Sequence, residues 1–176
     1  MDIKAALLQE HSKNQALKIT AYIGNSPDRF KILMDCFFDD DWRLNQCAAY
    51  TMNFVVDKRP HLFAPYLEKA IQNLKSPKHV AVKRNTLRIL QTYDIPEELQ
   101  GTVVDLAFDF LASHKEPIAI RVFSMSVIFQ IGKKEPDLFH ELKILIEEGI
   151  PTGSAGFKNR GQKILNYINK VFPEQY

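Results

Sequence analysis

The sequence predicts an all-α protein, an α-α superhelix of about four to five helical hairpins. Three observations favour this fold class. Prolines recur with a period of about 37 residues, and the apolar residues between them follow helical spacing. The chain of 176 residues has only 7 glycines and no sustained apolar and polar alternation, which a β fold would show.

The repeat is visible in prolines that stand where one helical pattern ends and the next begins. Because proline is tolerated in the first turn of a helix but not in its interior, such a series predicts a series of helix starts. The segment DKRPHLF at 57–63 recurs as KKEPDLF at 133–139, which indicates an internal repeat. The prolines of this register are Pro27, Pro60, Pro96, Pro136 and Pro173.

A second set of helix breakers divides each repeat into a helix A and a helix B. Ser76 and Asp41 are of residue types that favour the N-cap position, so each is predicted to start a helix B. The expected A helices span residues 28–38, 61–75, 97–113 and 137–149. The expected B helices span residues 42–58, 78–93, 117–132 and 155–172.

Both ends of the chain fit the repeat. Residues 2–11 and 13–24 are expected to form an N-terminal hairpin, closed by a turn at 24–27. The last expected helix is more polar than the helix at 117–132, as a terminal capping repeat requires. We therefore predict a single domain over residues 1–176, whose hairpins span 1–26, 27–59, 60–95, 96–135 and 136–176.

Each expected B helix also contains an arginine, namely Arg43, Arg84, Arg121 or Arg160. Together with the period near 37 residues, two helices per unit and a proline at the head of helix A, this pattern resembles HEAT and armadillo repeats. The resemblance covers nearly the whole chain, which also looks similar to short bacterial HEAT-like proteins. It implies a helical solenoid that binds other molecules, and it implies no reaction.

Charge is distributed unevenly between the two sets of helices. The net charge is only +2, so no strong global field attracts nucleic acid or a membrane. The expected A helices are net negative and the B helices net positive. B helices line the concave side of HEAT-like solenoids, so the resemblance implies a basic partner-binding groove. Its predicted residues are Trp42, Arg43, Lys83, Arg84, Arg88, Arg121, Lys158, Arg160 and Lys163.

Two classes of partner fit such a groove. An acidic protein or peptide partner would make the chain a non-catalytic interaction scaffold. The alternative is nucleic acid, as in the HEAT-like DNA glycosylases, whose basic groove uses tryptophan and aspartate; here those residue types meet at Trp42, Asp41 and Arg43. A third interpretation needs no partner, because the cations could pair with acids of neighbouring helices, each exposed pair adding only about 0–1 kcal/mol.

A turn rich in small residues, IPTGSAGFKNRG at 150–161, precedes the last expected helix. Backbone N–H groups at a helix start, followed by basic residues, can bind an anion, so Ser154, Gly156 and Lys158 form a possible anion site. The turn is not a P-loop, since no Lys-Ser or Lys-Thr pair follows Gly161. The competing interpretation is a simple turn with Ser154 as the N-cap and glycines for close packing.

No catalytic arrangement is recognisable in the sequence. The 5 histidines are scattered, and none has a His or Cys at metal-ligand spacing, so we expect no bound metal. No Ser–His–Asp, Cys–His or paired-carboxylate motif can be located. We therefore expect no cofactor. The one catalytic activity left open is base excision, which the resemblance to the HEAT-like DNA glycosylases would imply.

The remaining features indicate a cytoplasmic protein. Cys36 and Cys47 lie in or beside apolar helical patterns, so reduced core thiols are expected rather than a disulfide. The start of the chain does not resemble a signal peptide, and no apolar run is long enough to span a bilayer. The sequence makes no prediction of the oligomeric state.

Overall fold

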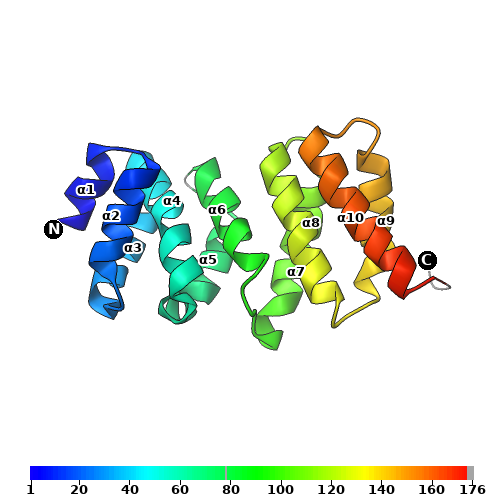
Figure 1. Cartoon of the computed structure of the whole chain (residues 1–176), viewed down its shortest axis with the longest axis horizontal. Coiled ribbons are helices and arrows are strands. Elements are labelled where there is room, and N and C mark those ends of the chain that lie inside the picture. Colours follow the sequence, from blue (N-terminus) through cyan, green and yellow to red (C-terminus); the bar gives the residue numbers. More distant parts are fainter. Residues whose placement is uncertain (78, 174–176) are drawn as a thin grey trace. The chain divides into compact units, whose positions relative to one another are not determined.

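The computed structural model describes residues 1–77 and 79–173, and within these residues every regular element is a helix (Figure 1). The fold class is therefore the predicted one, an α-α solenoid. The chain divides into two compact units, Met1–Ile89 and Leu90–Tyr176. A single domain over residues 1–176 stays a prediction.

The first unit is built from paired helices that stack on one another. Helix α1 packs on α2 and α3 on α4, and across these pairs α1 packs on α3 and α2 on α4. Each of these four helices packs against at least two of the others, which is how a repeat protein forms a continuous core. The helices are α1 (Ile3–Gln9), α2 (Lys13–Ile23), α3 (Pro27–Phe37), α4 (Trp42–Lys58), α5 (Leu67–Asn73) and α6 (Val80–Leu90).

Capping residues explain where several of these helices begin and end. The Asp41 carboxylate accepts hydrogen bonds from the backbone N–H groups of Arg43 and Leu44, which confirms Asp41 as the N-cap of α4. At the end of α2, Gly24 has a φ of 56°, a left-handed conformation that costs glycine little. Ser26 then caps α3 by accepting from the N–H of Arg29.

The third predicted hairpin differs from the structure at both helices. Instead of one helix over 61–75, two short 3₁₀ turns, η1 (Pro60–Leu62) and η2 (Ala64–Tyr66), precede α5. Pro65 explains the break, because proline has no N–H to donate to the carbonyl group four residues earlier and disfavours the α-helical conformation at the residue before it.

The prediction of a helix over 78–93 is also corrected, since α6 spans only Val80–Leu90; Lys78 lies outside the described residues. The prediction of Ser76 as its N-cap is wrong. His79 lies directly before the helix, and its Nδ1 accepts a hydrogen bond of 3.1 Å from the N–H of Ala81.

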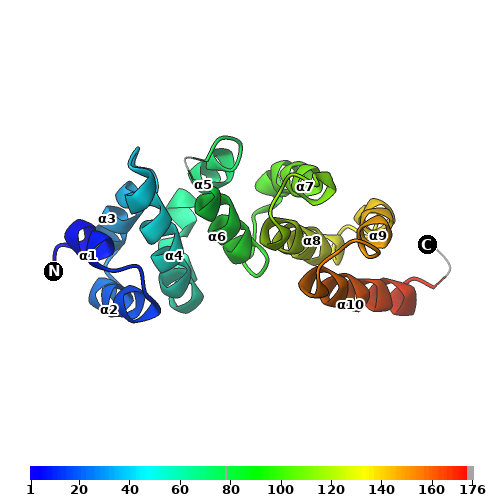
Figure 2. The ribbon, with the colours of Figure 1, turned by 90° about the horizontal axis from the view of Figure 1, so that it is seen from above.

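The second unit consists of two layers of helices, which Figure 2 shows from above. Helices α7 (Glu97–Ala112) and α9 (Leu138–Gly149) pack on each other in one layer, and α8 (Ile118–Gly132) and α10 (Ala155–Val171) in the other. Helix α8 contacts all three other helices of the unit, which explains why its sequence is apolar on nearly every side. The layer of α8 and α10 carries the surface described below.

Three general expectations can be compared with the structure directly. Cys36 and Cys47 are free and buried, as expected of core thiols. Each predicted hairpin range contains two α-helices. Within the described residues, no helix combines the length and the apolar character that crossing a membrane would need.

Candidate functional site

Four of the predicted groove residues lie at the surface of the first unit. The Trp42 side chain is 57 % exposed, and its indole stacks on the His79 ring with a centroid separation of 5.7 Å and an interplanar angle of 25°. Arg43 and Arg84 are exposed, and Lys83 is half-buried. Because these side chains reach the surface, a partner can contact them, whereas most apolar side chains of the first unit are buried.

Arg88, a further predicted groove residue, forms an ion pair within the first unit. Its guanidinium lies 3.1 Å from the Asp57 carboxylate on α4, and both side chains are partly exposed. This ion pair agrees with the third interpretation of the basic residues, in which they pair with acidic residues of neighbouring helices and need no external partner. An exposed pair of this kind contributes at most about 1 kcal/mol to stability.

Arg121 lies inside the second unit, so its prediction as a groove residue is wrong. The residue is only 7 % exposed, and its Nε donates a hydrogen bond of 2.9 Å to the carbonyl oxygen of Leu111 at the end of α7. The guanidinium carbon lies 4.9 Å from the centroid of the Phe157 ring. Burial lowers the pKa of Arg121. The sequence pattern failed here because α8 is covered on several sides, which a repeat register does not reveal.

The turn at 150–161 has the geometry of a simple turn, with Ser154 as the N-cap of α10 and a glycine that allows close packing. The Ser154 hydroxyl accepts from the N–H of Phe157 and so caps α10. A methyl group at Gly161 would lie 2.7 Å from Cγ2 of Ile146, so this glycine allows close packing of α10 on α9. Gly156 and Lys158 are exposed. An anion site at Ser154, Gly156 and Lys158 stays a prediction.

Arg160 and Lys163 line a pocket of about 270 Å³ between α8, α10 and the segment that follows α6. Nη1 of Arg160 donates a hydrogen bond of 2.8 Å to the Ser126 hydroxyl on α8, which holds the guanidinium at the pocket. Among the residues that the structure describes, neither Arg160 nor Lys163 pairs with a carboxylate. The residues lining this smaller pocket are Gln91, Thr92, Ser126, Phe129, Gln130, Arg160, Lys163 and Ile164.

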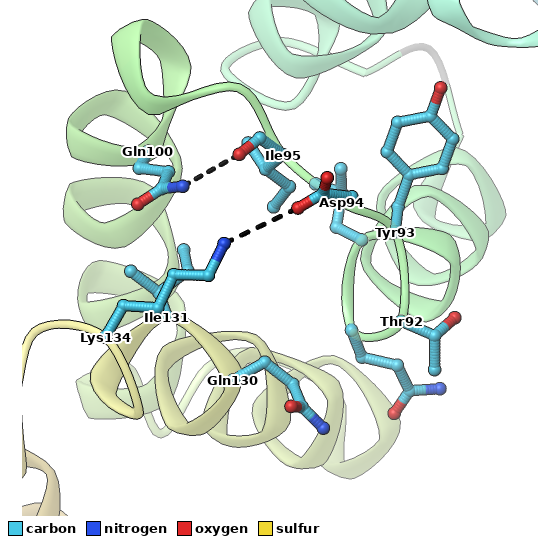
Figure 3. A pocket seen from close by; sticks show the side chains of 10 residues that line it. Thr92, Tyr93, Asp94, Ile95, Gln100, Gln130, Ile131 and Lys134 are labelled. Atoms are coloured by element: carbon cyan, nitrogen blue, oxygen red, sulfur yellow. Dashed lines mark hydrogen bonds and ion pairs between the residues drawn. The ribbon is translucent and has the colours of Figure 1, made fainter.

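A second, larger pocket has a volume of about 350 Å³, and Figure 3 shows the side chains that line it. Lys134, which follows α8, reaches across it to Asp94, with an Nζ to carboxylate distance of 3.6 Å. Gln100 of α7 donates a hydrogen bond of 2.8 Å to the carbonyl of Ile95. The lining residues are Leu90, Gln91, Thr92, Tyr93, Asp94, Ile95, Gln100, Gln130, Ile131 and Lys134.

The two pockets have three lining residues in common, Gln91, Thr92 and Gln130, and all their residues belong to the second unit. Together they form one surface, here called the α8–α10 surface. Sequence reasoning found Arg160 and Lys163 but missed the polar residues between the pockets. A serine at 126 within an apolar helix was the available signal, because a buried hydroxyl needs a hydrogen-bond partner.

The electrostatic character of the α8–α10 surface follows from its helices. Neither α8 nor α10 contains an aspartate or glutamate, whereas α10 contains four basic residues, Lys158, Arg160, Lys163 and Lys170. Lys133 adds a further cation beside the smaller pocket, with Nζ 4.7 Å from the centroid of the Phe129 ring. At the larger pocket, burial is the main cause that raises the pKa of Tyr93, and the neighbouring Asp94 adds to it.

The described part of the chain contains no group of three or more His, Cys, Asp or Glu residues that could hold a metal ion. The fold is a helical repeat with two polar pockets on one surface; the smaller pocket is positively charged, and the larger one holds the ion pair of Lys134 and Asp94. The chain belongs to the HEAT repeat domain family, whose model matches residues 3–168. Comparison with curated proteins and with solved structures gives no match.

Proposed function

We propose that the protein is a non-catalytic interaction scaffold that binds an acidic protein or peptide through basic B-helix surfaces. Membership of the HEAT repeat family supports the general class, since HEAT repeats commonly mediate protein interactions. The free, buried thiols of Cys36 and Cys47 are compatible with a cytoplasmic location, which is part of the proposal.

One observation carries the choice of an acidic partner. Arg160 and Lys163 line a pocket that has no carboxylate among its lining residues. A surface charge without an internal counter-charge attracts an external one, and arginine binds carboxylates with two parallel hydrogen bonds. The proposal therefore centres on Arg160 and Lys163 of the α8–α10 surface and leaves out Arg121, which is buried.

The proposal can be tested by titrating the isotope-labelled protein with a short glutamate-rich peptide and following the backbone amide signals by NMR. We expect signals of α8 and α10 to shift, and the Arg160→Glu and Lys163→Glu variants to lose this response. Lys115→Glu is the matched control, because this exposed lysine between α7 and α8 lines neither pocket. No shift at millimolar peptide would overturn the proposal.

Trp42 favours a second candidate, binding of nucleic acid in a groove like that of the HEAT-like DNA glycosylases. Its exposed indole stacked on His79 offers an aromatic face on which a base can stack, and Arg43 beside it can contact a phosphate. Short duplex DNA should then bind at 50 mM salt, and Arg43→Glu with Arg84→Glu should abolish binding. Absence of binding at that low salt concentration eliminates this candidate.

A further inference from the structure

The two ends of the α8–α10 surface differ in charge, although they share lining residues. The smaller pocket has two cations without carboxylate partners among the described residues, Arg160 and Lys163. The larger pocket has one cation, Lys134, which pairs with Asp94. We propose that the surface binds an extended peptide that places an acidic side chain in the smaller pocket and a neutral side chain in the larger one. This inference rests on the proposed function.

The smaller pocket has the chemistry to bind a carboxylate. One N–H of Arg160 is used by Ser126, which fixes the orientation of the guanidinium. Arginine has five N–H donors, so others remain for a ligand. Lys163 supplies an ammonium from the next turn of α10, as an i, i+3 neighbour on the same face. A carboxylate bound here would have charge-assisted hydrogen bonds from two sides.

The larger pocket selects against a second acidic side chain. A carboxylate entering it would meet the Asp94 carboxylate, and Lys134 is already paired with that group. Leu90, Ile95 and Ile131 form apolar parts of the wall, and all three are buried. Amide groups of Gln100 and Gln130 supply neutral polarity. A neutral side chain with some apolar surface is therefore complementary to the residues that line this pocket.

The residues shared by the pockets indicate how one ligand could occupy both. Gln91 and Gln130 line both pockets and carry amide groups that can bind the backbone of a peptide. In an extended peptide the side chains of residues i and i+2 point to the same side. Acidic and neutral residues at such close spacing can therefore enter the two pockets together.

The decisive variant is Asp94→Asn, which removes the negative charge of the larger pocket and frees Lys134. The Asp94 side chain is 96 % exposed, so the fold should tolerate the change. Two labelled hexapeptides serve as probes, one with glutamate followed two residues later by leucine, and one with glutamate at both positions. Fluorescence anisotropy measures their dissociation constants at constant ionic strength.

We expect the wild type to bind the glutamate–leucine peptide more tightly than the double-glutamate peptide. The Asp94→Asn variant should bind the double-glutamate peptide about two- to fivefold more tightly than the wild type does. Arg160→Gln should lower the affinity for both peptides by about tenfold, and Lys115→Gln should change neither affinity. Binding that depends on Arg160 but shows no change of preference in Asp94→Asn overturns this inference and leaves the proposed function standing. Binding of neither peptide, or binding unaffected by Arg160→Gln, contradicts the proposed function and this inference together.

Discussion

The guanidinium of Arg121 is a buried cation at the C-terminal end of α7. The last four carbonyl groups of a helix have no partner within the helix, and Leu111 supplies one of them. The hydrogen bond from Arg121 satisfies this carbonyl and places a positive charge at the negative end of the helix dipole. The arginine thus ties α8 to α7 and contributes to stability.

Arg121→Met should lower the free energy of unfolding by about 2 kcal/mol, because the buried carbonyl of Leu111 loses a charged donor. Urea denaturation followed by circular dichroism measures the change. Arg160→Met is the matched control, since this residue also donates to a single partner but is exposed, and it should cost less than about 1 kcal/mol. Equal losses in the two variants would contradict a structural role specific to Arg121.

The Cys36 thiol should make the stability of the protein depend on pH in the alkaline range. Burial raises the pKa of Cys36 to about 11 from its ordinary value of 9.0. A group whose pKa is raised on folding contributes stability below the unfolded-state pKa and loses it as the pH rises through the folded-state pKa. The difference in free energy of unfolding between wild type and Cys36→Ala should therefore be constant up to about pH 9 and shrink toward pH 11.

Titration with a thiol reagent provides an independent check on this prediction. Burial also raises the pKa of Cys47, so both thiols should react slowly at neutral pH in the native protein and rapidly in urea. Fast labelling of the native protein would show that the thiols are accessible and would contradict the assigned burial.

At the scale of the secondary-structure elements, glycine decides how closely α10 approaches α9. Gly161 faces Ile146, which is fully buried, at a distance that leaves no room for a methyl group. Gly156 lies one turn closer to the start of the same helix, and a methyl group there would meet only the Ser154 hydroxyl at 3.8 Å. The two glycines thus have different physical roles within one helix.

Gly161→Ala should destabilise the protein by about 1–3 kcal/mol through overpacking. Gly156→Ala should stabilise it by up to about 1 kcal/mol, because alanine loses less conformational entropy on forming a helix. Thermal denaturation of both variants compares the signs directly. A gain of stability from Gly161→Ala would mean that Ile146 can move aside without cost.

Proline and capping signals predicted most helix boundaries, but they failed where two signals lay close together. Pro60 correctly marks the end of α4, yet the helix expected after it is delayed by Pro65 until Leu67. Ser76 is the residue predicted to cap α6, but His79 makes the cap contact. Both errors arise because a local signal shows that a helix can start, while packing decides which start is used.

At the scale of the whole molecule, a net charge of +2 limits how salt can act on binding. The proposed contact uses a few cations on one surface, and their attraction is screened over about 10 Å at 0.1 M salt. Raising the salt concentration from 50 to 200 mM should therefore lower the affinity for an acidic peptide by no more than about tenfold. A groove that contacts six phosphates of DNA would lose about a thousandfold over this range.

Dissociation constants of peptide and duplex DNA, measured over that salt series, separate the two candidate functions. A thousandfold loss for DNA together with weak peptide binding would reverse the order of the proposals. Arg84→Glu should weaken DNA binding but leave peptide binding unchanged, because Arg84 is exposed and lines neither pocket of the second unit.

The sequence alone determined the all-helical repeat, because proline positions and apolar spacing act locally and each repeat encodes them again. It also determined that the B helices are basic, since charge can be counted without coordinates. Tertiary structure decided which cations reach solvent: it buried Arg121 between α7 and α10, paired Arg88 with Asp57, and placed Arg160 and Lys163 around one pocket. Those outcomes depend on the packing of neighbouring helices and the exposure it leaves, which a single helical period does not specify.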